Sequence, residues 1–446
     1  MEEEPPRPGR RSTAPTPAPS PGKVRCGVSQ RIKVLTVDDS VVVRRLVTDV
    51  LASDPAIEVV GTAANGKLAL EKILQLKPDV VTLDIEMPVM DGLEAIKEIR
   101  KIDRRLPVIM FSTLTERGAT ATLEALSSGA SDYVTKPANV GSVAESMESV
   151  RQQLIPKIKA LVPHLGHLAA PPAAPAPSAP AATPARPATP VTTRTPTGAA
   201  KTPRALVIGS STGGPEALSA VLAKLPATLG VPVLVTQHMP PVFTRLYAQR
   251  LDKSSALRVV EATDGEPVVA GTVYVAPGDF HMEVARRGPQ MVIKLHQGPA
   301  ENFCRPAVDV MLRSAVAAFG GELLAVILTG MGSDGKLGCK DIAAAGGQVL
   351  AQDEATSVVW GMPGAVTREG IADEVLPLSA IADAIQRRLG PGARTASAPH
   401  PPAARPPAAG STRPTVSTSP TRSTPPARPP ASRPAAPAAR PSQGRW

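Results

Sequence analysis

Between Ile32 and Leu161, short apolar runs alternate with amphipathic segments, and this rhythm constrains the fold more than any other feature of the chain. The runs are IKVLTV, IEVVGTA, DVVTLD, PVIMFS and SDYVT, and a stretch with helical spacing of apolar residues follows each of them. Short runs that are apolar throughout are typical of strands buried on both faces of a parallel sheet. Five such repeats in about 125 residues predict an α/β domain with helices on both faces of the sheet.

The same rhythm returns between Arg204 and Leu389. The strand candidates are ALVIGSS, VPVLVTQ, GTVYVAP, MVIKLH, LLAVILTG and GQVLAQ. Helical patterns cover residues 215–224, 306–319 and 336–345. We therefore expect a second α/β domain, so that the chain holds two doubly wound parallel sheets.

The remaining segments have a different composition. They hold much of the chain's 51 Pro, whereas the whole chain has only five Phe, three Tyr and two Trp. We divide the chain into a disordered arm, a first domain, a Pro/Ala-rich linker, a second domain and a disordered Pro/Arg-rich tail, at residues 1–30, 31–155, 156–203, 204–390 and 391–446. The linker should be extended and semi-rigid, although a polyproline segment that binds a partner is an alternative.

The formal charge of +10 does not predict a nucleic-acid interface. Residues 391–446 contain eight Arg, no Lys and no acidic residue, so the rest of the chain carries only about +2. The excess charge therefore belongs to the tail rather than to a folded binding face.

Cysteine use and hydropathy indicate a cytoplasmic protein that is not embedded in a membrane. Cys26, Cys304 and Cys339 are scattered without metal-ligand spacing, as expected of reduced thiols. The first residues, MEEEPPRPGRR, lack the apolar core of a signal peptide. No run of 18 apolar residues occurs, so we expect no membrane span.

Acidic and polar residues gather where the strands of the first domain should end. The residues at these positions are Asp38, Asp39, Asp84, Ser112 and Lys136. Because the carboxyl ends of parallel strands line one crevice, the three carboxylates form a candidate Mg²⁺ site. A carboxylate beside the metal can attack a phosphoryl group, whose other oxygens the hydroxyl and the ammonium can bind. Taken alone, Asp-Asp-Ser is more often a helix cap and Lys-Pro a turn.

Four motifs of the first domain, VLTVDDS, LDIEMPVMDGLEAI, VIMFST and YVTKP, resemble the receiver domain of two-component response regulators. The resemblance implies a flavodoxin-like fold in which Asp84 accepts the phosphoryl group. It implies that Mg²⁺ is held by Asp38, Asp39, Asp84 and the backbone carbonyl of Glu86. It also implies that the phosphoryl group is sensed by Ser112, Lys136 and the switch aromatic Tyr133.

A candidate nucleophile opens the second domain. Residues 209–213 read Gly-Ser-Ser-Thr-Gly, a G-x-S-x-G motif with Ser211 at its centre. An apolar strand precedes the motif and a helix begins near Pro215, which is the context in which a serine projects from a sharp turn. The alternative is a Gly-rich turn that binds phosphate or has no chemical role, but the P-loop Lys and the G-x-G-x-x-G spacing are missing.

A base and an orienting acid follow at other strand ends. His238 directly follows VPVLVTQ, and Asp334 lies in a Gly-rich loop after LLAVIL. These two residues and Ser211 could meet as a triad, although His281 and His296 compete for the role of the base. The order Ser–His–Asp differs from the Ser–Asp–His order of α/β-hydrolases, so we do not expect that fold.

The second domain resembles the catalytic domain of chemotaxis protein-glutamate methylesterases through VIGSSTGGPEAL, VLVTQHMPPVFT, VYVAPGDFHM and VILTGMGSDG. The resemblance implies a Rossmann-like domain with Ser211 as nucleophile, His238 as general base and acid, and Asp334 as the residue that orients His238. It implies no cofactor for the ester chemistry. Ser210 stands where many members have Ala.

Both resemblances together imply phosphorylation-activated hydrolysis of glutamate γ-methyl esters on methyl-accepting chemotaxis receptors, with deamidation of receptor glutamines. A chemotaxis histidine kinase would be the phosphodonor. Backbone N–H groups of the Gly330–Gly332 loop are the expected oxyanion donors. The alternatives are a receiver-controlled regulator that only binds a partner and a general esterase of small molecules. The sequence gives no firm prediction of an oligomeric state.

Overall fold

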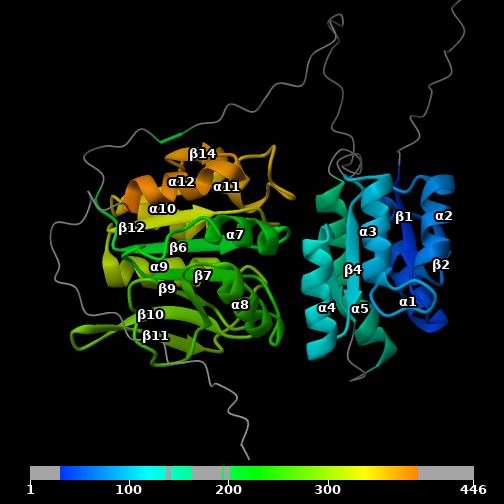
Figure 1. Cartoon of the computed structure of the whole chain (residues 1–446), viewed down its shortest axis with the longest axis horizontal. Helices are drawn as coiled ribbons and strands as arrows, with labels where there is room; N and C mark the ends of the chain where they lie inside the picture. The colour runs from blue at the N-terminus through cyan, green and yellow to red at the C-terminus, as the bar shows by residue number, and fades with distance from the viewer. Residues whose placement is uncertain (1–30, 137–141, 163–192, 195–200, 390–446) are drawn as a thin grey trace, which may run out of the picture. The chain divides into compact units, whose positions relative to one another are not determined.

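The computed structural model describes residues 31–136, 142–162, 193–194 and 201–389 (Figure 1). The expected N-terminal arm, most of the linker and the tail lie outside the described residues. The described strands form a five-stranded sheet, a two-stranded sheet and a seven-stranded sheet.

The first sheet has five parallel strands in the order β2-β1-β3-β4-β5. Their bounds are β1 (Ile32–Val37), β2 (Ile57–Ala63), β3 (Val80–Asp84), β4 (Val108–Ser112) and β5 (Asp132–Thr135). The helices are α1 (Val41–Ala52), α2 (Gly66–Leu76), α3 (Gly92–Ile102), α4 (Glu116–Ser127) and α5 (Val143–Leu161). Helices α1 and α5 pack on one face of the sheet, and α2, α3 and α4 pack on the other. The predicted doubly wound α/β fold is confirmed, but residues 156–161, which we assigned to the linker, are the end of α5.

Polar caps fix the ends of these helices close to the carboxyl edge of the sheet. Ser40 caps α1, because its side chain accepts a hydrogen bond from the backbone N–H of Val43. The cap in the Asp-Asp-Ser sequence is therefore the serine. The carboxylates of Asp38 and Asp39 remain available at the strand end.

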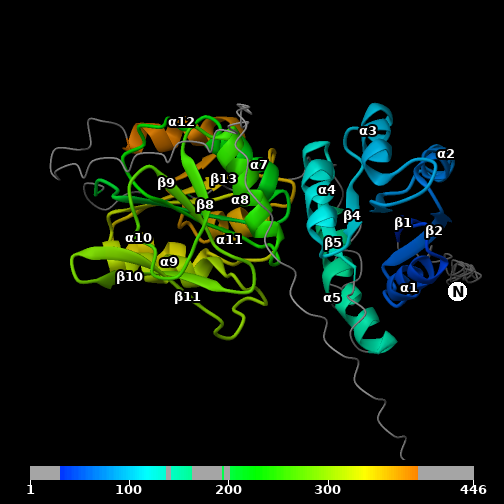
Figure 2. The same ribbon diagram turned by 60° about the horizontal axis from the view of Figure 1, so that its bottom comes forward.

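The second large sheet has seven parallel strands in the order β14-β13-β12-β6-β7-β9-β8. Their bounds are β6 (Ala205–Ser210), β7 (Val233–Gln237), β8 (Arg258–Glu261), β9 (Thr272–Val275), β12 (Leu323–Ile327), β13 (Gln348–Gln352) and β14 (Glu374–Leu376). One face carries α7 (Gly214–Leu222), α8 (Phe243–Ser254) and α12 (Leu378–Leu389) (Figure 2). The other carries α9 (Val308–Phe319), α10 (Lys336–Ala344) and α11 (Met362–Arg368).

The predicted strand MVIKLH does not join this sheet. It lies in β11 (Gln290–His296), which pairs with β10 (His281–Arg287) as a separate antiparallel hairpin. Gly288 and Pro289 form the two-residue connection, and Gly288 has a φ of 61°. Such a short turn joins only antiparallel strands, because a parallel connection needs a long crossover.

Strand β6 lies at the position where the chain order of the seven-stranded sheet reverses. It pairs with β12 on one side and with β7 on the other. The loops that follow these three strands therefore meet at one edge, which is where ligands bind in open α/β sheets.

Candidate functional site

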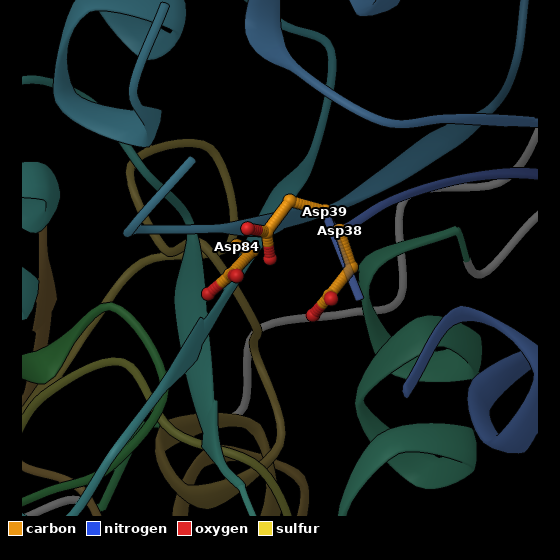
Figure 3. A group of neighbouring side chains, drawn as sticks. All are labelled: Asp38, Asp39 and Asp84. Carbon is orange, nitrogen blue, oxygen red and sulfur yellow. The ribbon is translucent and has the colours of Figure 1, made fainter. Parts of the chain in front are cut away.

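Three carboxylates converge at the carboxyl edge of the first sheet (Figure 3). Asp38 and Asp39 follow β1, and Asp84 ends the neighbouring strand β3. Each residue offers an oxygen, and these oxygens lie within 4.8 Å of one another. Oxygen ligands at this spacing suit a hard divalent cation.

Lys136 joins this acidic cluster. Its Nζ lies 3.0 Å from Asp38 Oδ2 and 2.8 Å from Asp84 Oδ2. Burial raises the pKa of Asp84 to about 6, although the bond with Lys136 opposes the rise. A cation bound to the carboxylates would favour their charged form. Asp39, Asp84, Glu86, Ser112 and Lys136 all line a cavity of about 280 Å³.

Two residues predicted to sense the phosphoryl group, Ser112 and Tyr133, contact other elements instead of the three carboxylates. Ser112 Oγ donates to the carbonyl of Gly118 at 3.1 Å and accepts from Thr122 at 2.6 Å, so its hydroxyl is bound to α4. Tyr133 does not line the cavity. Its buried ring stacks on Phe243 of α8, with centroids 4.9 Å apart and ring planes 6° apart.

Ser211 lies on a sharp turn between β6 and α7. Its N–H donates to the carbonyl of Thr329 at 3.1 Å, and its carbonyl accepts from Gly214 at 2.7 Å. Gly213 has a φ of 74°, which only glycine adopts without steric cost. At Gly330, a Cβ atom would lie 2.9 Å from Ser211 Cβ, so glycine allows this loop to approach the serine.

The neighbouring Ser210 is turned into the core. Its fully buried hydroxyl donates to Gln237 Oε1 at 2.6 Å, and Gln237 Nε2 donates to the carbonyl of Ser211 at 3.0 Å. Gln237 therefore supports the turn. The sequence analysis missed this residue, although a polar residue that ends a buried apolar strand was a usable signal.

His238 and Asp334 are in direct contact. His238 Nε2 lies 2.8 Å from Asp334 Oδ2. Asp334 also accepts hydrogen bonds from the N–H groups of Val308 and Asp309, at 2.6 and 3.0 Å. These are the first donors of α9, whose N-cap Ala307 has no side-chain cap, so Asp334 caps this helix from a distant loop. Although burial opposes it, the bonds with His238 and the backbone lower the pKa of Asp334.

The other ring nitrogen of His238 contacts a residue that the sequence analysis did not select. Cys304 Sγ lies 3.4 Å from His238 Nδ1, whereas Ser211 Oγ makes no hydrogen bond within the described part of the chain. Burial lowers the pKa of His238, but the contacts with Asp334 and Cys304 outweigh it and raise the pKa to about 10. No sequence signal could have identified Cys304, because the contact depends on how a distant loop folds.

The competing histidines are engaged elsewhere. His281 Nε2 bonds the carbonyl of Pro299 at 3.0 Å, and its Nδ1 accepts from Ala307 at 3.3 Å. His296 Nδ1 accepts from Gly298 at 3.1 Å. Both histidines thus serve loop structure, and His238 is the one beside Asp334.

A cavity of about 20 Å³ lies at Ser211, and residues from both large sheets line it. The lining on the serine side includes Ser211, Thr212, Gly213, Pro215, Gln237 and His238. The opposite lining is Leu126, Asp132, Tyr133 and Lys157. This volume holds about one water molecule, so this cavity has no room for an ester side chain in this arrangement.

Hydrogen bonds join the two sides of this cavity. Thr212 Oγ1 donates to Asp132 Oδ2 at 2.6 Å, and the same carboxylate pairs with Lys157 at 2.9 Å. On α8, Arg250 donates to the carbonyl of Leu123 at 2.8 Å. These contacts hold β5 against the Ser211 turn and α4 against α8.

Comparison with known proteins agrees with this architecture. The family model of the CheB methylesterase matches residues 206–385, and that of the response regulator receiver domain matches residues 34–148. The chain is 59% identical to a protein-glutamate methylesterase/protein-glutamine glutaminase of a Nocardioides strain, over 80% of this chain and 95% of the relative. The chain belongs to this methylesterase/glutaminase family.

Other members and solved structures are also similar to this methylesterase. The protein of the same description from Trichodesmium erythraeum is 47% identical, over 81% of this chain and 99% of the relative. A crystal structure of the Thermotoga maritima CheB methylesterase catalytic domain is 45% identical, covers 42% of this chain and 98% of its own, and has a TM-score of 0.41.

Family membership makes this methylesterase a hydrolase with a receiver domain. Receiver domains generally use Mg²⁺ for phosphorylation, and the carboxylates of Asp38, Asp39 and Asp84 fit that ion. Among the described helices, none combines the length and apolar character needed to cross a membrane.

Proposed function

We propose that Ser211, His238 and Asp334 form the hydrolytic triad of this methylesterase, and that phosphorylation of Asp84 activates it toward methylated chemoreceptors. The contact that best supports the triad is the 2.8 Å bond between His238 and Asp334. Both residues follow strands that flank β6, and Ser211 follows β6 itself. Nucleophile, base and orienting acid are thereby gathered at one sheet edge.

The bond to Asp334 supports a division of roles between the two ring nitrogens of His238. Nε2 donates to the carboxylate, so in the neutral ring Nδ1 carries the lone pair. Nδ1 takes the proton of Ser211 Oγ as this oxygen attacks the ester carbonyl, and returns it to the leaving methoxide. Methanol departs, and water then hydrolyses the acyl-enzyme to free Ser211 and glutamate. A glutamine amide enters the same path and releases ammonia.

The oxyanion needs backbone donors close to Ser211. The N–H of Gly330 is already bound to the carbonyl of Val359 at 3.0 Å, so the expected loop cannot use that group. The proposal therefore narrows to the N–H groups of Met331 and Gly332. They would stabilise negative charge that develops in the transition state.

The contacts around Ser211 support control by the receiver domain. Receiver residues leave a cavity of about 20 Å³ at Ser211, and Tyr133 stacks on Phe243. Mg²⁺ bound at the carboxylates supplies charge neutralisation for phosphoryl transfer to Asp84. Lys136 and Ser112 would then bind phosphoryl oxygens, and the loss of the Ser112 contacts with α4 would disturb the surface that covers Ser211. A coupling of 1–3 kcal/mol gives roughly 5–150-fold activation.

The substrate and the phosphodonor complete the proposal. We assign methyl-accepting chemotaxis receptors as substrate and a chemotaxis histidine kinase as phosphodonor. The earlier alternative of a regulator that only binds a partner is not supported, because the family is one of enzymes. A general esterase of small molecules would not need a receiver domain over its nucleophile.

Methanol release from methylated receptor membranes tests the triad. Ser211→Ala should lower the rate by several orders of magnitude, since loss of a triad nucleophile has effects of that size. Ser210→Ala is the matched control and should retain most activity, because its hydroxyl is buried against Gln237. Normal activity of Ser211→Ala would refute the assignment.

A further inference from the structure

The turn at residues 301–304 lies directly beside the proposed triad. Cys304 Sγ is 3.4 Å from His238 Nδ1, and Asn302 Nδ2 is 2.9 Å from Asp334 Oδ1. The residue between them, Phe303, has a fully exposed side chain. The ring therefore lies in solvent, on a turn whose residues on either side contact the proposed triad.

The other residues of this turn are fixed. Glu301 forms two 2.6 Å bonds with Arg313 of α9, and its backbone exchanges hydrogen bonds with Cys304 at 2.9 and 3.1 Å. Asn302 also donates to Asp309 at 3.1 Å. Because its neighbours are held, Phe303 is presented on a rigid support rather than on a mobile loop.

The conformation of Phe303 is unfavourable for its residue type. Asn302 has a φ of 53° and Phe303 a φ of 62°. A two-residue turn with positive φ at both positions strongly prefers Asn-Gly. A phenylalanine at the second position costs conformational free energy and gains no burial in return. Strain of this kind beside an active site points to a function for the side chain.

We infer that Phe303 is a substrate-contact residue, whose ring binds an apolar side chain of the receptor helix beside the methyl-esterified glutamate. This inference rests on the proposed function. The ring does not hold the receiver domain, since it is fully exposed while receiver residues line the cavity at Ser211. It is therefore available to the protein substrate, whereas a small ester carries no neighbouring apolar side chain for the ring to bind.

The test compares two substrates with the full-length protein and a phosphodonor. On methylated receptor membranes, Phe303→Gly should lower kcat/KM by about tenfold, as expected for loss of one aromatic anchor. On a small γ-methyl ester of blocked glutamate, kcat/KM should not change. The thermal midpoint should not fall, because glycine adopts this φ freely. Phe303→Leu should keep most receptor activity, and Val269→Ala, at another exposed apolar position, should have no effect.

Three results would overturn the inference. They are an unchanged kcat/KM of Phe303→Gly on receptors, an equal loss on both substrates, and a lower thermal midpoint, since the last two indicate a structural role. A failure of the proposed function looks different. In that case the unaltered protein hydrolyses the small ester but releases no methanol from receptors, and the inference falls with it.

Discussion

The two candidate sites of this methylesterase differ in access. The acidic pocket around Asp84 is a cavity of about 280 Å³ lined by the residues that we propose for phosphoryl transfer, whereas the cavity at Ser211 has only about 20 Å³. The residues that close the second cavity come from α4, β5 and α5 of the domain that holds the first. The comparison indicates a resting state in which the pocket around Asp84 is open and the cavity at Ser211 is closed.

Among the changes that we propose, removal of the receiver domain should have the largest effect on access to Ser211. A fragment that begins near Thr202 lacks the lining residues Leu126, Asp132, Tyr133 and Lys157. We expect its methanol release from receptor membranes to exceed the basal rate of the full-length protein by roughly 5–150-fold, and to ignore a phosphodonor. If the fragment is no faster than the unphosphorylated whole, the receiver does not act as a lid.

Cys304→Ala should alter the pH dependence of the esterase. The contact with Cys304 helps to raise the pKa of His238 to about 10, so its loss should lower this pKa. The base must be neutral to accept a proton, and activity therefore rises with pH through its pKa. The rising limb of kcat/KM on a small ester should move to lower pH. For each unit by which the pKa of His238 falls, about tenfold more of the base is neutral at pH 7.

Cys304→Ser is the conservative control for this shift. A hydroxyl can keep a hydrogen bond with Nδ1, so the limb should lie between those of the unaltered protein and Cys304→Ala. Identical profiles of all three proteins would show that Cys304 does not influence the base.

Loss of one side chain that holds the closed state should have the smallest effect. Arg250→Ala removes the 2.8 Å bond to the carbonyl of Leu123 and the bond to Ser127 Oγ without touching the triad. If the closed state loses about 1 kcal/mol of stability, the basal rate of methanol release should rise roughly fivefold, and the rate of the phosphorylated protein should not change. Lys253→Ala, an exposed position on the same helix, should not change either rate. Equal basal rates of the two variants would argue against this contact as part of the lid.

The sequence was sufficient to predict which polar residues lie together at the ends of the parallel strands. Apolar runs identified the strands, and the residues after them identified the acidic cluster and the pair His238–Asp334. It failed where backbone turns and long-range contacts decide the structure. The turn at Gly288 joins β10 and β11 as an antiparallel hairpin, where we had predicted a parallel strand. Cys304 contacts His238, which lies 66 positions earlier in the chain.

Local sequence patterns also could not predict which residues cover Ser211. The bond between Thr212 and Asp132 joins residues 80 positions apart in the chain. Neither residue belongs to a motif that predicts the contact, since its geometry arises only when the two sheets pack together. The resemblance implied that phosphorylation activates the enzyme, whereas the structure supplies the residues through which this control can act.

The central claim, that Asp84 controls access to Ser211, is tested most directly by methanol release from methylated receptor membranes with and without a phosphodonor. We compare the unaltered protein with Asp84→Asn in the presence of Mg²⁺. The account predicts that a phosphodonor accelerates the unaltered protein by roughly 5–150-fold and leaves Asp84→Asn at its unchanged basal rate. Equal acceleration of both proteins, or of neither, would contradict it.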